Sequence, residues 1–138
     1  MSAKDRFHQV LKNALEKDKW IITHDPLRLK FGNVNFQIDL GAEKIIAAEK
    51  DKQKIAIEIK SFLNPSAIND FYSALGQFLS YRIALESFEP ERTLYLAIPF
   101  DTYKTFFQFE FTQIAINKYQ IPLIIYDPIS EVIIEWIK

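Results

Sequence analysis

Apolar residues recur every three or four positions in three stretches of the chain, which is the spacing of one buried helix face. The first stretch follows Ser2, a plausible helix cap, and predicts a helix over about residues 4–18. Ser66 is the predicted N-cap of a second helix, which ends near Glu86. The segment 102–118 is rich in aromatic residues, as strands are, but its length favours a helix and we predict a helix there.

Alternating or short continuous apolar runs, bounded by turn residues, predict strands between these helices. A hairpin turn is expected at Asp-Lys-Gln, residues 51–53. The predicted strands are 20–26, 27–31, 34–40, 44–50, 54–60, 93–99, 121–127 and 131–137. This order predicts an α/β fold, with a mixed β-sheet flanked by helices. The chain length of 138 residues is typical of one domain, so residues 1–138 are expected to form a single unit.

The predicted strand 54–60 carries the most informative polar residues. Its three isoleucines alternate with other residues and fall on one face, whereas Glu58 and Lys60 fall on the opposite face. A carboxylate and an ammonium group therefore lie side by side, about 7 Å apart along the strand. Such a polar face is often simply solvated, so Glu-x-Lys alone does not distinguish a reactive site from an ordinary surface.

An upstream acid makes the site interpretation stronger. Asp39 lies between two apolar residues, where an acid is unexpected, and Glu43 follows close by. Magnesium prefers oxygen ligands, and two neighbouring carboxylates repel each other unless a cation lies between them. Asp39 and Glu58 could therefore hold one Mg²⁺ or Mn²⁺ ion, with the carbonyl of Ile59 as a further ligand.

The expected hairpin register leaves the position of the first acid open. A turn centred on Lys52 would pair Glu58 near Ile46 and not near Asp39. Asp39 would then reach the site from the start of its strand or from a bend at Gly41. Under this register Glu43 is a credible substitute or additional ligand.

Lys60 and the second helix supply further candidates. Lys60 could orient or deprotonate a water molecule, or stabilise charge on a phosphate. Gln77 and Tyr81 are four residues apart, so they share a helix face, and Arg82 is adjacent. In the functional interpretation Gln77 contacts a metal-bound water or Lys60, while Tyr81 and Arg82 contact nucleic acid. The alternative is a helix surface at a packing boundary.

Composition excludes several classes of site. There is no cysteine, and only His8 and His24 are present, which argues against disulfides, thiolate chemistry and a histidine-rich zinc site. His8 is expected to be a packed or surface residue. The chain has only three glycines, so no glycine-rich phosphate loop is expected, and its net charge of −1 is unlike that of a general nucleic-acid binder. We expect a cytoplasmic protein with no signal peptide and no membrane span.

These residues resemble a known nuclease motif. Asp39, followed by Glu58-Ile59-Lys60 and then Gln77 with Tyr81, is similar to the PD-(D/E)XK nuclease superfamily. More narrowly, the chain resembles the XisH family in three stretches, which are IDLGAEKIIAAEKDKQKIAIEIKSF, ALGQFLSYRIAL and RTLYLAIP. Members of that family are known as controlling factors for excision of the fdxN DNA element.

The resemblance implies a function as well as a fold. It implies a restriction-endonuclease-like sheet with Asp39, Glu58 and Lys60 at one edge. It also implies a role in site-specific DNA excision beside a recombinase and a second small protein. Two hypotheses follow: a Mg²⁺-dependent DNA endonuclease with Gln77 in support, or a catalytically silent controlling factor that acts by protein and DNA binding. A homodimer is expected in either case.

Overall fold

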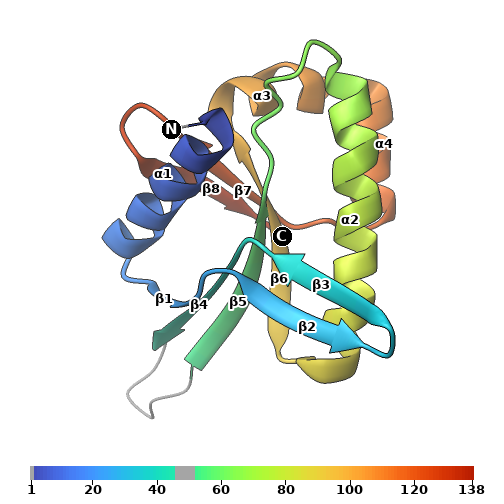
Figure 1. Cartoon of the computed structure of the whole chain (residues 1–138). Helices are drawn as coiled ribbons and strands as arrows, with labels where there is room; N and C mark the ends of the chain where they lie inside the picture. The colour runs from blue at the N-terminus through green and yellow to red at the C-terminus, as the bar shows by residue number, and fades with distance from the viewer. Residues whose placement is uncertain (1, 46–51) are drawn as a thin grey trace.

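Helices cover both faces of a single large sheet (Figure 1). The structure is a computed structural model that describes residues 2–45 and 52–138. Its helices are α1 (Ala3–Lys17), α2 (Ala67–Phe88), α3 (Phe100–Lys104), the 3-10 helix η1 (Phe106–Gln108) and α4 (Glu110–Lys118). Its strands are β1 (Ile21–His24), β2 (Leu27–Phe31), β3 (Val34–Ile38), β4 (Leu40–Ile45), β5 (Lys52–Ile59), β6 (Arg92–Pro99), β7 (Leu123–Asp127) and β8 (Val132–Ile137).

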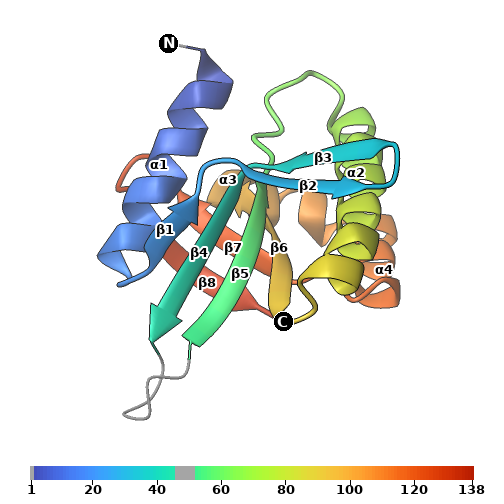
Figure 2. The same ribbon diagram turned by 60° about the horizontal axis from the view of Figure 1, so that its bottom comes forward.

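The large sheet is mixed, with strand order β1-β4-β5-β6-β7-β8. Strands β5, β6 and β7 are parallel to one another, whereas β1, β4 and β8 pair antiparallel with their neighbours. The remaining strands, β2 and β3, form a separate hairpin that extends toward α2 (Figure 2). The predicted mixed sheet with flanking helices is therefore confirmed. No helix in the described ranges is long and apolar enough to cross a membrane.

One face of the sheet is covered by α1. This helix starts where the sequence indicates, because the Asp5 amide donates a 3.1 Å hydrogen bond to the Ser2 hydroxyl. Its apolar stripe, including Leu11 and Leu15, is fully buried against the isoleucine face of β5, including Ile57. The face of β5 on which alternation placed the isoleucines is therefore the face that packs against α1.

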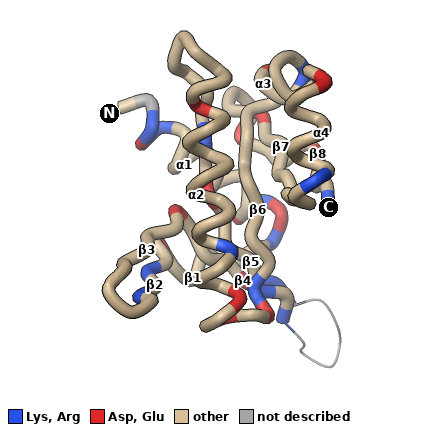
Figure 3. Tube along the Cα trace, turned by 90° about the vertical axis from the view of Figure 1, so that its right-hand side faces the viewer, with Lys and Arg blue, Asp and Glu red and all other residues tan. Residues whose placement is uncertain are grey.

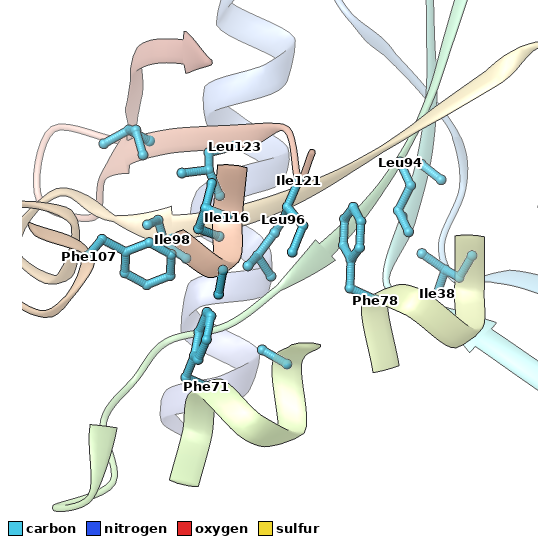
Figure 4. Close-up of a cluster of buried hydrophobic side chains, with 14 of the residues drawn as sticks. Ile38, Phe71, Phe78, Leu94, Leu96, Ile98, Phe107, Ile116, Ile121 and Leu123 are labelled. Atoms are coloured by element: carbon cyan, nitrogen blue, oxygen red, sulfur yellow. The ribbon is translucent and has the colours of Figure 1, made fainter. Parts of the chain in front are cut away.

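The opposite face is covered by α2 and α4 (Figure 4). Phe71 and Phe78 of α2 lie in one buried cluster with Leu96 and Phe107. Ala56 of β5 belongs to the same cluster, so the second face of β5 is buried as well. The alternative that Glu-x-Lys lies on a simple solvated face is therefore wrong, because a helix packs over it.

The prediction of one helix over residues 102–118 is wrong. The segment is divided into α3, η1 and α4. The division occurs where Phe106 and Phe107 turn inward and become buried. Both rings pack against Phe62, with ring centroids 6.1 and 5.4 Å away, and burial of two aromatic rings outweighs the continuation of a helix.

The predicted continuous strand 34–40 is also wrong, because the chain changes sheets at Asp39. Residues before this position belong to the small hairpin as β3, and those after it belong to the large sheet as β4. The acid that seemed misplaced within an apolar strand therefore lies at a bend between two strands.

The expected hairpin turn at residues 51–53 is displaced. Lys52 and Gln53 already belong to β5, and Lys52 pairs with Ile45 of β4. Most of the predicted strand 44–50 lies outside the described residues, which omit 46–51. The observed pairing of the described residues therefore differs from the predicted register.

Candidate functional site

The observed register brings the two predicted acids together. Leu40 pairs with Ile57, so Asp39 and Glu58 occupy the next positions on the two strands. The expected pairing of Glu58 near Ile46 is wrong, because it assumed a turn at Lys52. Asp39 lies at the bend directly before β4, so it is placed beside Glu58 without a bend at Gly41.

The Asp39 carboxylate is held by the backbone of β5. The antiparallel ladder ends at the Leu40–Ile57 pair, so the Ile59 amide lies beyond its last backbone partner on β4. Asp39 Oδ2 accepts a 2.8 Å hydrogen bond from this amide. A strand residue directs its N–H and C=O to the same side, so the Ile59 carbonyl faces the side of β5 on which Asp39 lies.

Glu58 is the most perturbed acid in the site. It is only 5 % exposed, and its Oε1 atom has no hydrogen-bond partner among the described residues. The Lys60 ammonium lies 3.6 Å from the other carboxylate oxygen, Oε2. Burial and the charge of Asp39 raise the pKa of Glu58 to about 8, although Lys60 opposes this rise. A cation bound between the two carboxylates would favour the ionised form of Glu58 and would therefore lower its pKa.

One α2 residue, Tyr81, lies near the acids, since the charges of both act on it. The Tyr81 ring packs against Phe36, with centroids 6.1 Å apart. Burial, together with the charges of Glu58 and Asp39, raises the pKa of Tyr81 to about 12, so its hydroxyl remains protonated. Gln77 lies one turn earlier on the same helix face, and its buried Oε1 has no partner among the described residues. Tyr81 of the predicted α2 face therefore lies near the acids.

The structure does not bring Glu43 into this group. Glu43 lies four residues further along β4 than Asp39, where it pairs across the strands with Lys54. Its carboxylate forms a 3.4 Å ion pair with Lys52. Glu43 was named because it follows Asp39 closely, and the incorrect hairpin register made it a credible ligand.

Arg82 is engaged elsewhere in the fold. Its guanidinium group donates hydrogen bonds of 2.6 and 2.7 Å to the carbonyls of Tyr119 and Gln120, which follow α4. It also lies over the Phe78 ring, 4.8 Å from the centroid. Arg82 thus joins α2 to the end of α4, which favours a structural role over the predicted contact with nucleic acid.

We expect Arg82→Gln to destabilise the protein by about 1–3 kcal/mol, because two charge-assisted hydrogen bonds to carbonyls are lost. Denaturant unfolding followed by circular dichroism measures this change. Lys118→Gln is the matched control, since that exposed side chain lies 5.8 Å from the neighbouring Tyr119 ring and its loss should have little effect. Equal stability of the two variants would contradict the structural role of Arg82.

A pocket of ≈ 250 Å³ opens beside the acids, and sequence reasoning missed part of it. Asp39, Ile59 and Lys60 line one side, and Lys4 and His8 of α1 line another. His8 is held by a 2.6 Å contact with Asp25, which also pairs with Lys12 at 2.7 Å. The i, i+4 spacing of the polar residues Lys4, His8 and Lys12 beside the apolar stripe was the available signal.

The oxygen atoms near the acids are of the kind that binds a divalent cation, but there are few of them. The described residues contain no group of three histidine, cysteine, aspartate or glutamate side chains placed to hold a metal. Asp39, Glu58 and the Ile59 carbonyl would supply oxygen ligands, and water would have to supply the rest, as is usual for Mg²⁺. The unpaired Oε1 of Glu58 and its raised pKa are consistent with such a ligand.

Fold and site together define an α/β protein whose mixed sheet carries a carboxylate pair and a lysine beside a polar pocket. The chain belongs to the XisH family, whose sequence profile matches residues 1–134. No curated protein matches the sequence.

Two crystal structures are similar to this chain over nearly its whole length. An XisH family protein from Nostoc punctiforme PCC 73102 is 52% identical, with a TM-score of 0.89, covering 97% of this chain and 100% of that one. An fdxN element excision controlling factor protein from Anabaena variabilis is 50% identical, also with a TM-score of 0.89, covering 97% of this chain and 99% of that one.

Proposed function

We propose that this protein is a divalent-cation-dependent DNA endonuclease-like factor that acts in excision of a DNA element. The observation that carries this proposal is the buried Glu58, whose carboxylate has an unpaired oxygen beside Asp39 and Lys60. A buried acid that is unsatisfied in this way costs stability, and such groups are concentrated at functional sites.

The chemistry rests on four residues. Asp39, Glu58 and the Ile59 carbonyl would hold Mg²⁺ or Mn²⁺, which supplies Lewis acidity toward a phosphate oxygen and a more acidic bound water. Lys60 lines the pocket and would orient the attacking water or stabilise negative charge on the phosphate. Gln77 would support this arrangement from α2, where its unpaired oxygen is a free acceptor for water or for Lys60.

The order of these groups supports placing the site among PD-(D/E)XK nucleases. An acid at a strand bend, a Glu-x-Lys strand and a glutamine on the following helix occur in the order typical of that superfamily. The similar Anabaena variabilis protein is described as an fdxN element excision controlling factor. By similarity, we infer a role in the same kind of excision. We also propose a cytoplasmic location, and the resemblance to the XisH family implies a recombinase and a second small protein as partners.

The direct test is cleavage of plasmid and branched DNA with Mg²⁺ or Mn²⁺. We expect Lys60→Ala to reduce the rate by roughly 10²-fold or more, because a positioned acid–base or charge-stabilising group is lost. The matched control is Lys54→Ala, which removes a lysine from the same strand and the same strand face, paired with Glu91 at 3.8 Å. Cleavage by Lys60→Ala at the parent rate would overturn the site assignment.

A second function fits a different observation. The two residues predicted to contact nucleic acid from α2, Tyr81 and Arg82, are both engaged within the fold. A catalytically silent controlling factor would retain the fold and bind its partners without turnover. Calorimetry with Mn²⁺ separates the two functions: binding that Glu58→Gln abolishes favours the nuclease, and absence of binding by the parent protein favours the silent factor.

A further inference from the structure

The outward face of the β2–β3 hairpin presents four polar side chains in two cross-strand pairs. Arg28 pairs with Gln37, and Lys30 pairs with Asn35. All four side chains are exposed, and a groove of ≈ 450 Å³ runs over this part of the hairpin. Two basic and two amide side chains thus form a compact, regular array on one face of a two-stranded ribbon.

The opposite face fixes the ribbon to the protein. Leu27 and Ile38 are buried in the same cluster as Phe71 and Phe78 of α2. Toward the tip, Phe31 packs against the Phe88 ring with centroids 5.4 Å apart. The polar array is therefore held in place by the hydrophobic core, and binding to it would require little ordering of the chain.

The ribbon is a local basic surface on a chain that is not basic overall. Residues 27–38 contain Arg28 and Lys30 but no aspartate or glutamate, whereas the whole chain has a net charge of −1. The basic positions on β2 are visible along the hairpin in Figure 3. No ion pair within the described residues involves either side chain. Their charge is thus available to an external anion.

We propose that the outer face of the β2–β3 ribbon binds duplex DNA. The major groove of DNA admits a two-stranded ribbon, in which arginine and lysine contact phosphates and guanine while asparagine and glutamine contact adenine. Arg28 and Lys30 are about 7 Å apart along one strand, a distance that corresponds to roughly two base-pair steps. The array supplies both the charge and the amide groups that groove binding uses.

The position of the ribbon connects it to the candidate site. Ile38 ends β3 and is followed directly by Asp39, one of the two acids. DNA on the ribbon would thus be bound next to the point where the chain enters the site. This inference rests on the proposed function, which it deepens by assigning the surface that recognises DNA.

The test is binding of a fluorescein-labelled random-sequence duplex, measured by anisotropy over a series of salt concentrations without divalent cations. We expect Arg28→Gln/Lys30→Gln to weaken binding roughly tenfold or more, with a salt slope smaller by about 2, because two phosphate contacts are lost. Asn35→Asp/Gln37→Glu, which is nearly isosteric, should also weaken binding by placing acids in the array. The matched control, Lys104→Gln/Lys118→Gln, removes the same charge from α3 and α4 and should bind like the parent.

The outcomes separate this inference from the proposed hydrolysis. Duplex binding is measured without divalent cations, so its result does not depend on whether the protein cleaves DNA. Loss of affinity in both ribbon variants but not in the control supports the inference, even if the parent never cleaves DNA. Equal affinity of ribbon variants and control, an equal loss in all three, or no binding by the parent would overturn it. Thermal melting of each variant confirms that the compared proteins are folded.

Discussion

Glu58→Gln is expected to melt at a higher temperature than the parent protein at pH 8 in cation-free buffer. The folded parent must keep a buried carboxylate beside Asp39, and this raises the pKa of Glu58 from 4.5 to about 8. Between those values the folded state retains a proton that the unfolded state has released, so stability falls as the pH rises. The loss is on the order of 5 kcal/mol at its full extent, which corresponds to roughly 15–20 °C in melting temperature.

A pH series supplies the measurement. The parent should lose stability steadily from about pH 5 to pH 8, and the Glu58→Gln variant should lose much less, because its amide does not titrate. Glu43→Gln is the matched control, since Glu43 lies on the neighbouring strand in an ion pair with Lys52. Parallel melting curves for Glu58→Gln and the parent across this range would show that Glu58 ionises normally.

Addition of Mn²⁺ extends the same experiment to function. A ligand that binds only the folded state raises its stability, so the parent should gain melting temperature at pH 8. Glu58→Gln should gain little, because one of the two carboxylate ligands is gone. The residue would thus be retained at a cost to stability, which is the usual relation between a strained site and its activity.

The strand that bears Glu58 and Lys60 could be predicted because alternation is a local signal. Its isoleucine face is buried as predicted, and the Ser2 and Ser66 caps accept the expected hydrogen bonds. These features depend on residues within one turn or one strand. The sequence pattern is therefore enough to predict a feature whose physical cause lies within a few neighbouring residues.

The meeting of Asp39 and Glu58 could not be derived from spacing alone. It depends on the hairpin register, and the sequence around Lys52 favoured a turn that the structure does not form there. A shift of one residue in register moves every side chain of a strand to the opposite face of the sheet. An error in the predicted register therefore changes which residues are expected to meet at a site. The predicted register is also what made Glu43 a credible ligand.

The burial of Glu58 and the division of residues 102–118 share a long-range cause. Glu58 is covered because α2 packs over β5, and the helix breaks because Phe106 and Phe107 pack against Phe62 from the loop after β5. Neither contact is encoded in nearby residues. Tertiary packing overrides local propensity at both places.

Phe71→Ala is expected to lower the free energy of unfolding by about 3–5 kcal/mol, the usual cost of removing a buried aromatic ring. Phe71 is 0% exposed, and its ring lies 5.6, 5.9 and 6.2 Å from those of Phe106, Phe107 and Phe111. Tyr72→Ala is the matched control, because the adjacent ring is 58% exposed and its removal should cost much less. Denaturant unfolding at fixed pH compares the two variants directly.

The same variant tests whether packing of α2 causes the unusual ionisation of Glu58. If Phe71→Ala loosens α2, water reaches the carboxylate and the pKa of Glu58 moves back toward its ordinary value. The loss of stability between pH 5 and pH 8 should then be smaller in Phe71→Ala than in Tyr72→Ala. An unchanged pH dependence, together with the expected loss of stability, would show that the carboxylate is kept dry by its own strand and by Tyr81, and that the aromatic cluster stabilises the fold without tuning the site.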